Sequence, residues 1–147
     1  LLLFPYHRAF PLVKSIDYVM GIQALKEAKS KGADDVLYVS NGIVTECPRA
    51  NFFLVTADNK LLTPGDNVLA GITRKQIIGL LGTEYAIEIR EVTVQDIADA
   101  KEAFITSTTK NITPVLALVG FKEFGTQPGA ITKKLQLKLE TLLNPQD

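Results

Sequence analysis

Apolar and polar positions along this 147-residue chain change several times between helical and extended spacing. Tyr18, Ile22, Leu25 and Ala28 follow one stripe of a helix, and Gly32 stands where such a helix would stop. The first pattern therefore predicts an amphipathic helix that ends just before Gly32.

Extended segments come next. The stretches VLYVS (36–40) and IVTEC (43–47) flank Asn41-Gly42, the strongest short-range signal for a β-hairpin. Further strands are predicted at residues 51–56, 61–63, 86–92, 103–108 and 112–119.

Three later helices complete the pattern. One begins at Gly71 and runs to about Leu81, and a short one follows Thr93, which with Asp96 resembles a capping box, and ends near Ala100. The last is an amphipathic helix over 130–143, with apolar residues at 131, 135, 139 and 142. Hairpins mixed with helical crossovers predict one mixed α/β domain whose sheet contains parallel and antiparallel pairs.

The amino-acid composition limits the kinds of binding partner that are expected. Apolar residues make up 46% of the chain, enough for one sizeable core, and 16 basic residues balance 16 acidic ones. Because no long basic block is present, the sequence offers no electrostatic case for nucleic acid or an anionic membrane. A small-molecule partner is predicted instead.

Cysteine and histidine counts exclude several site chemistries. Cys47 is the only cysteine, so an internal disulfide and a cysteine-rich metal site are ruled out, which fits a reducing cytoplasm. His7 is the only histidine, which disfavours a triad or a multi-histidine metal site. The apolar start, residues 1–5, lacks the basic flank and cleavage site of a signal peptide.

Two charged residues are candidates for chemistry. Lys14 lies in an apolar setting just before the first helix, where desolvation would favour a Schiff-base amine, although a surface lysine with a buried stem is the commoner case. Glu46, near the end of the hairpin's second strand, is placed to hold a cationic ring nitrogen or simply to face water beside Arg49.

Two turns are candidates for anion binding. The Gly71 turn opens a helix whose first amides point outward, and Thr73 adds a hydroxyl, although Thr73 is also an ordinary N-cap. Ser107, Thr108 and Thr109 place hydroxyls and amides where a strand meets a turn, a combination also common without ligands.

The sequence resembles the large C-terminal domain of the class IV (fold type IV) pyridoxal-phosphate enzymes, from about Pro5 to Leu139. This family includes branched-chain aminotransferases, D-amino acid aminotransferases and aminodeoxychorismate lyase. Five stretches in order carry the resemblance: KSIDYV, NGIVTECPRANFFLV, LLTPGDNVLAGITRKQII, ADAKEAFITSTTKNITPV and ITKKLQLKL. It implies a mixed sheet curled into a barrel-like domain with flanking helices, similar to the C-terminal domain of D-amino acid aminotransferase.

The resemblance also implies roles around the cofactor ring. Lys14 matches the lysine that binds pyridoxal 5′-phosphate as a Schiff base and shuttles the proton, and Glu46 matches the carboxylate that pairs with the pyridine nitrogen. Tyr18 falls where branched-chain enzymes have a tyrosine near the ring hydroxyl. Asp17, where the family usually has asparagine, and Pro48-Arg49, where small residues are common, depart from the pattern.

The two turns match the family's contacts to the cofactor phosphate. Gly71, Ile72 and Thr73 correspond to the phosphate-binding turn. Thr108 corresponds to a second phosphate contact and shares its turn with Ser107 and Thr109. In relatives the amides of this second turn also lie near the substrate carboxylate, so Thr108 and Thr109 are expected to contact substrate.

The activity implied is transfer of an amino group between a branched-chain or similar amino acid and a 2-oxo acid. A lyase of the aminodeoxychorismate type remains an alternative, as does a non-catalytic fragment or binding domain. The resemblance further implies a small N-terminal domain that this chain lacks, and a homodimer of the intact protein.

Overall fold

The computed structural model describes residues 1–16, 18–82 and 84–144. The described strands form three sheets. The four-stranded sheet has the order β1 (Leu2–Pro5), β2 (Val36–Ser40), β3 (Ile43–Val44) and β8 (Val92–Thr93). The six-stranded sheet runs β10 (Asn111–Val115), β9 (Glu102–Ser107), β5 (Ala50–Val55), β6 (Leu61–Pro64) and β7 (Ile87–Arg90), with β4 (Glu46–Cys47) beside β5. The small ladder joins β11 (Ala117–Leu118) to β12 (Lys122–Glu123).

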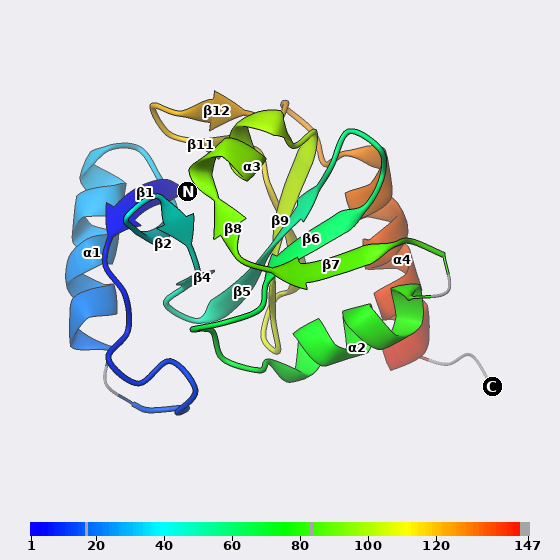
Figure 1. Cartoon of the computed structure of the whole chain (residues 1–147), viewed down its shortest axis with the longest axis horizontal. Helices are drawn as coiled ribbons and strands as arrows, with labels where there is room; N and C mark the ends of the chain where they lie inside the picture. The colour runs from blue at the N-terminus through cyan, green and yellow to red at the C-terminus, as the bar shows by residue number, and fades with distance from the viewer. Residues whose placement is uncertain (17, 83, 145–147) are drawn as a thin grey trace.

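Both kinds of strand pairing occur. β1 pairs with β2 and β6 with β7 in parallel, whereas the remaining pairs among the described strands are antiparallel. The helices are α1 (Val19–Ser30), α2 (Ile72–Leu81), α3 (Val94–Asp99) and α4 (Ala130–Leu143). Figure 1 shows α1 beside β1 and β2, with α2 and α4 on the opposite side of the molecule. The predicted mixed α/β class with flanking helices is confirmed.

Three segments predicted as single strands are each divided at one residue. The chain leaves the four-stranded sheet at Thr45 and enters the six-stranded one, and it makes the reverse passage at Glu91. At Leu116 it passes from the six-stranded sheet to the small ladder. Strands that change sheets bend at such corners, which an unbroken apolar pattern does not reveal. The chain passes between sheets at these corners, and the described strands form no closed ring of pairing.

Local signals in the sequence identified turns and caps correctly. Asn41 and Gly42 both have positive φ, 52° and 78°, and connect β2 to β3 in the predicted hairpin. Gly32, with φ of 78°, ends α1: its N–H donates to the Lys29 carbonyl, and Ala33 N–H donates to Ala28. The predicted capping box of α3 is present.

The buried face of α1 differs from the predicted stripe. Gly21, Ala24 and Ala28 face inward, whereas Ile22 is 57% exposed and Tyr18 is 38% exposed. Small residues are needed because a Cβ at Gly21 would lie only 3.1 Å from Pro48 Cβ. The larger apolar side chains therefore remain on the outer surface.

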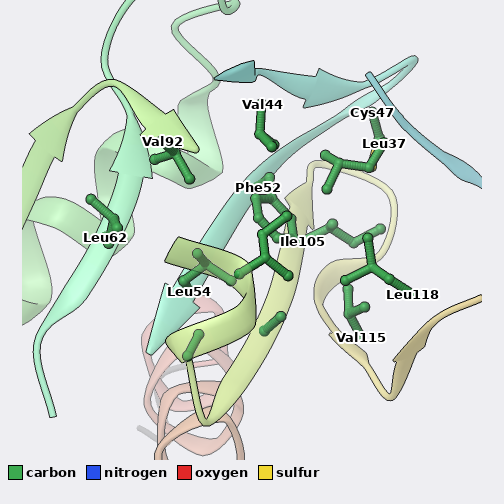
Figure 2. Packing of buried hydrophobic residues seen from close by; sticks show 13 residues of the cluster. Leu37, Val44, Cys47, Phe52, Leu54, Leu62, Val92, Ile105, Val115 and Leu118 are labelled. Atoms are coloured by element: carbon green, nitrogen blue, oxygen red, sulfur yellow. The ribbon is translucent and has the colours of Figure 1, made fainter. Parts of the chain in front are cut away.

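The core extends over both faces of β5. Phe52 and Leu54 point toward the cluster drawn in Figure 2, together with Ile105 of β9. Phe53 and Val55 point the opposite way, into a second cluster with residues of α2 and α4, and the Phe53 and Phe104 rings stack at 4.9 Å. A strand covered on both faces is held firmly, so β5 gives a rigid base for neighbouring side chains.

The start of α4 is held by a carboxylate from β9. Glu102 accepts hydrogen bonds from Ile131 N (3.1 Å), Thr132 N (2.8 Å) and the Thr132 hydroxyl (2.7 Å). Gly129, the N-cap, leaves room for Glu102, because a Cβ there would lie 2.0 Å from its carboxyl carbon. The contact fixes α4 against the sheet without a local capping side chain.

We expect Glu102→Ala to lower the free energy of unfolding by about 1.5 kcal/mol, because amides of the α4 first turn lose their acceptor. Urea denaturation of the substituted chain measures this. Glu123→Ala, at an exposed position of β12, serves as the matched control and should change stability by less than about 0.5 kcal/mol. Equal losses in the two variants would contradict the capping role.

Among the described residues, no helix has the length and apolar character needed to cross a membrane.

Candidate functional site

Glu46 lies just after the Thr45 corner, in β4 of the six-stranded sheet, and its side chain is only 4% exposed. Its Oε1 accepts a hydrogen bond from Arg8 Nη1 at 2.9 Å. Its Oε2 accepts from Leu69 N at 3.0 Å and from Asn51 Nδ2 at 3.3 Å. A carboxylate offers about four acceptor positions, so these three donors leave room for one more.

Opposing influences act on the charge of Glu46. Burial raises the pKa of Glu46 above its ordinary value, while the hydrogen bond from Arg8, the Leu69 amide and the positive charge of Arg74 counteract this rise. A further N–H donor at the free acceptor position would favour the ionised form. The site therefore suits a cationic ring nitrogen, the first of the two roles considered for Glu46.

One guanidinium ties the Lys14 segment to Glu46. While Nη1 of Arg8 contacts Glu46, its Nη2 donates to the Val13 carbonyl at 2.7 Å, and Nη1 also reaches the Pro11 carbonyl at 3.3 Å. Val13 directly precedes Lys14. The backbone that carries Lys14 is therefore held beside the buried carboxylate.

The Lys14 side chain itself is exposed, so the expected apolar enclosure is not provided by the described residues. Its apolar sequence neighbours also face outward, with Leu12 75% and Ile16 93% exposed. Tyr18, just before α1, is partly exposed, and the Arg49 guanidinium lies 6.0 Å from its ring centre. Asp17 falls outside the described residues.

Gly71 is the N-cap of α2, with φ of −66° and ψ of 142°, and no side chain caps this end. Thr73 lies inside the first turn and is 6% exposed, so its interpretation as an N-cap was wrong. The first intrahelical bond runs from Lys75 N to Gly71 O (2.9 Å), which leaves the amides of Ile72 and Thr73 outside the helix's own bonding pattern. Such amides are suited to an anion.

The second turn follows β9. Ser107 is partly buried, whereas Thr108 and Thr109 are exposed, and the hydroxyls of Ser107 and Thr109 lie 3.5 Å apart. Lys110 N donates to the Ser107 hydroxyl at 3.2 Å. Thr106, immediately before this turn, is 2% exposed.

Two buried polar atoms beside these turns have no partner. The two atoms are Arg74 Nε, next to Thr73 in sequence, and Thr106 Oγ1, next to Ser107. They are the buried side-chain nitrogens and oxygens without a hydrogen-bond partner in the part of the chain that the structure describes. Arg74 Nη2 donates to the Pro64 carbonyl at 2.9 Å. Unsatisfied donors flanking both predicted phosphate-binding turns fit the acceptor oxygens of a phosphate group.

A hollow of about 740 Å³ opens beside the Arg8-linked segment, lined by residues 9–13 on one side and 65–67 on the other. The loop that leads to Gly71 therefore lies next to the segment that leads to Lys14. The structure thus brings Lys14, Glu46 and the Gly71 turn into one region, and the β5–β9 pairing links the Ser107–Thr109 turn to it through Asn51 and Thr106.

Three contributors were missed in the sequence: Arg8, Asn51 and Arg74. Arg8 was detectable as a lone cation in an apolar stretch, but its partner is 38 residues away. Asn51 carried no chemical signal, because its importance comes from lying opposite Glu46 in the β4–β5 pair. Arg74 directly follows Thr73 of a proposed anion-binding turn. Its positive charge alone could have identified it as a candidate anion-binding residue.

Known proteins share this architecture. The family model "Amino-transferase class IV" matches residues 1–118. A "Probable branched-chain-amino-acid aminotransferase" of Aquifex aeolicus is 36% identical over 81% of this chain and 40% of its own length. The branched-chain amino acid aminotransferase of Escherichia coli superposes with a TM-score of 0.82 at 27% identity, covering 96% of this chain and 51% of that one.

A "Putative 4-amino-4-deoxychorismate lyase" of Legionella pneumophila superposes with a TM-score of 0.86 at 32% identity, over 95% of this chain and 54% of that one. The chain thus spans about half the length, or less, of these relatives. The family match covers most of the chain and includes Lys14, Glu46 and both turns. The chain therefore belongs to the class IV aminotransferase family.

Proposed function

We propose that the chain is the cofactor-binding part of a pyridoxal 5′-phosphate-dependent aminotransferase that exchanges amino groups between branched-chain or similar amino acids and 2-oxo acids. The observation that carries the proposal is the buried Glu46 carboxylate, which three protein donors hold in place with one acceptor position free. Family membership and the aminotransferase names of relatives support it.

The resemblance to the family and the buried position of Glu46 support the proposed ring contacts. Glu46 holds the pyridine nitrogen in its protonated form, and Tyr18 lies near the ring hydroxyl. The bound cofactor supplies an electron-withdrawing ring that stabilises negative charge at the substrate α-carbon. Lys14 Nζ would hold the cofactor and, once freed, would carry the proton from that α-carbon to the cofactor as the amino group is transferred.

The proposed phosphate contacts lie at the two turns. The amides that follow Gly71, at Ile72 and Thr73, receive the phosphate together with the Thr73 hydroxyl. Ser107 and Thr108 provide the second contact. Thr108 and Thr109 also receive the substrate carboxylate through the amides of their turn.

We further propose that a smaller N-terminal domain completes the substrate pocket and that the intact protein is a cytoplasmic homodimer. The relatives' greater length and the exposed apolar surface around Lys14 support such a further domain. The large apolar residues on this surface include Phe10 (73% exposed), Leu12 (75%), Ile16 (93%) and Val19 (70%). An apolar surface of this kind usually contacts further protein.

The direct test is a single half-reaction with the native polypeptide and any further domain it carries. Pyridoxal phosphate and leucine are supplied, and mass spectrometry measures pyridoxamine phosphate and the keto acid. We expect both products, loss of at least about a thousandfold in rate for Lys14→Ala, and an unchanged rate for Lys26→Ala, an exposed lysine of α1. Lys14→Ala retaining the full rate would contradict the proposal.

A lyase is the second candidate, favoured by the similarity to the Legionella protein. The same product analysis, applied to an amino-acid substrate that carries a leaving group on its β-carbon, separates the two activities. An aminotransferase converts the cofactor into its amine form with each half-turnover, whereas a β-eliminating lyase releases its product and leaves the cofactor as the aldehyde.

A further inference from the structure

We propose that Asn51 is the positioning residue that sets the cofactor-ring carboxylate and the phosphate-binding turn at a fixed separation. The inference rests on the proposed function, because it assigns the ring contact to Glu46 and the phosphate contact to the Gly71 turn. Asn51 touches neither cofactor nor substrate in this account. It acts through the groups on either side of it.

The strand register places Asn51 between the two halves of the site. In the β4–β5 pair Asn51 lies directly opposite Glu46, and in the β5–β9 pair it lies opposite Thr106, which precedes the Ser107–Thr109 turn. Asn51 is 6% exposed and stands on the strand whose two faces are both covered by the core. Its side chain is therefore fixed by a rigid element.

The Asn51 amide closes a ring of hydrogen bonds with Glu46 and Leu69. Its Nδ2 donates to Glu46 Oε2 (3.3 Å) and to the Leu69 carbonyl (2.7 Å). Leu69 N in turn donates to the same Glu46 oxygen at 3.0 Å. A shift of the loop before Gly71 would therefore break contacts to the carboxylate, and a shift of the carboxylate would disturb the loop.

The Asn51 side-chain oxygen, Oδ1, packs against Gly71. A Cβ added to Gly71 would lie 2.2 Å from Asn51 Oδ1, so the N-cap of α2 rests directly against this side chain. Gly71 N also donates to the Leu69 carbonyl at 2.8 Å. One side chain thus contacts the carboxylate, the loop and the helix start, and it accounts for glycine at position 71 by close approach rather than by backbone angle.

The charged groups that act on Glu46 are the guanidiniums of Arg8 and Arg74. Cys47, its neighbour in β4, is a buried thiol whose pKa burial raises well above the ordinary value. Asn51 adds a neutral donor to this set. Asn51→Asp replaces that donor with a carboxylate of nearly the same shape, 3.3 Å from a Glu46 oxygen in the present geometry.

The test measures two quantities in the chain and its Asn51→Asp variant. Carbon-13 NMR titration of the Glu46 carboxyl, in cofactor-free protein, is expected to give a midpoint about one pH unit higher or more in Asn51→Asp. The affinity for pyridoxal phosphate at pH 7.5 is expected to fall at least about tenfold. Asn59→Asp, the same change on an exposed turn, should alter neither quantity.

Asn51→Ala provides a second variant, which removes the donor without adding charge. We expect a smaller rise of the Glu46 midpoint and a similar loss of affinity. A side chain that only supported the fold would lower the unfolding free energy while leaving the Glu46 midpoint unchanged. An unchanged midpoint in both variants would overturn the proposal.

The two measurements also separate this inference from the proposed function. If the unsubstituted protein failed to bind pyridoxal phosphate, the proposed function would fail, while the NMR titration would still decide whether Asn51 positions Glu46. If the protein bound the cofactor and Asn51→Asp bound it equally well, the role of Asn51 would fail alone.

Discussion

Replacing Arg8 with methionine is expected to lower the free energy of unfolding by about 2 to 3 kcal/mol at pH 7. The change leaves the Glu46 carboxylate, 4% exposed, without its closest cation. Removing one partner of a buried ion pair costs more than the pair contributes, because the remaining charge stays desolvated. Urea denaturation of the cofactor-free chain measures the loss.

The pH dependence of the Arg8→Met effect follows from the direction of the Glu46 shift. Folding raises the pKa of Glu46 above its ordinary value of 4.5, so ionisation of Glu46 opposes folding. This cost is absent below pH 4.5 and complete above the folded-state pKa. Without Arg8 the cost is larger, so the stability deficit of Arg8→Met should be greatest near pH 7 and smaller near pH 4.

A double-mutant cycle with Glu46→Gln provides the control. In that background no charge is left buried, so Arg8→Met should cost only hydrogen bonds to neutral acceptors, namely the Pro11 and Val13 carbonyls and the substituted amide oxygen, about 1 kcal/mol. The same loss in both backgrounds, or a deficit independent of pH, would show that Arg8 does not stabilise the Glu46 charge.

Gly71→Ala is expected to destabilise the chain by about 2 kcal/mol and to weaken pyridoxal phosphate binding. The added Cβ would lie 2.2 Å from Asn51 Oδ1, and Asn51 cannot move aside without breaking its bonds to Glu46 and Leu69. Gly71 has a φ of −66°, so backbone strain plays no part in this prediction. Thermal unfolding and cofactor titration measure the two effects.

Gly79→Ala is the matched control, because Gly79 lies in the same helix and a Cβ there meets nothing within 4 Å. Alanine is a better helix former than glycine, so this variant should gain about 0.5 to 1 kcal/mol and bind the cofactor normally. Stabilisation by both substitutions would contradict the close packing of Gly71 against Asn51.

Sequence patterns predicted the parts of the fold that depend on neighbouring residues. The Asn41-Gly42 hairpin, the Gly32 stop and the Thr93–Asp96 capping box each rest on contacts within a few positions, and all three are confirmed. The candidate site residues were identified by matching stretches of the sequence, in order, to those of a known family. Geometry brings the segments of these residues together, whereas their chemical roles stay predictions.

The features that the sequence could not predict depend on contacts between residues far apart in the chain. The corners at Thr45, Glu91 and Leu116 arise because the chain changes strand partners there, while the apolar pattern continues across each corner. The first strand, β1, was not predicted as a strand, because its parallel partner β2 begins more than thirty residues later, at Val36. Arg8 was missed for the same reason, since only the fold brings it to Glu46.

In the proposed function, Lys14, Glu46 and the two turns form one site for pyridoxal phosphate. Borohydride reduction of the native protein with stoichiometric pyridoxal phosphate, followed by peptide mass spectrometry, shows which lysine binds the cofactor. We predict one adduct, on Lys14, that is strongly reduced in Glu46→Gln and in Gly71→Ala. The absence of an adduct, or adducts spread over exposed lysines such as Lys26 and Lys133 with Lys14 unmodified, would show that these residues do not form such a site.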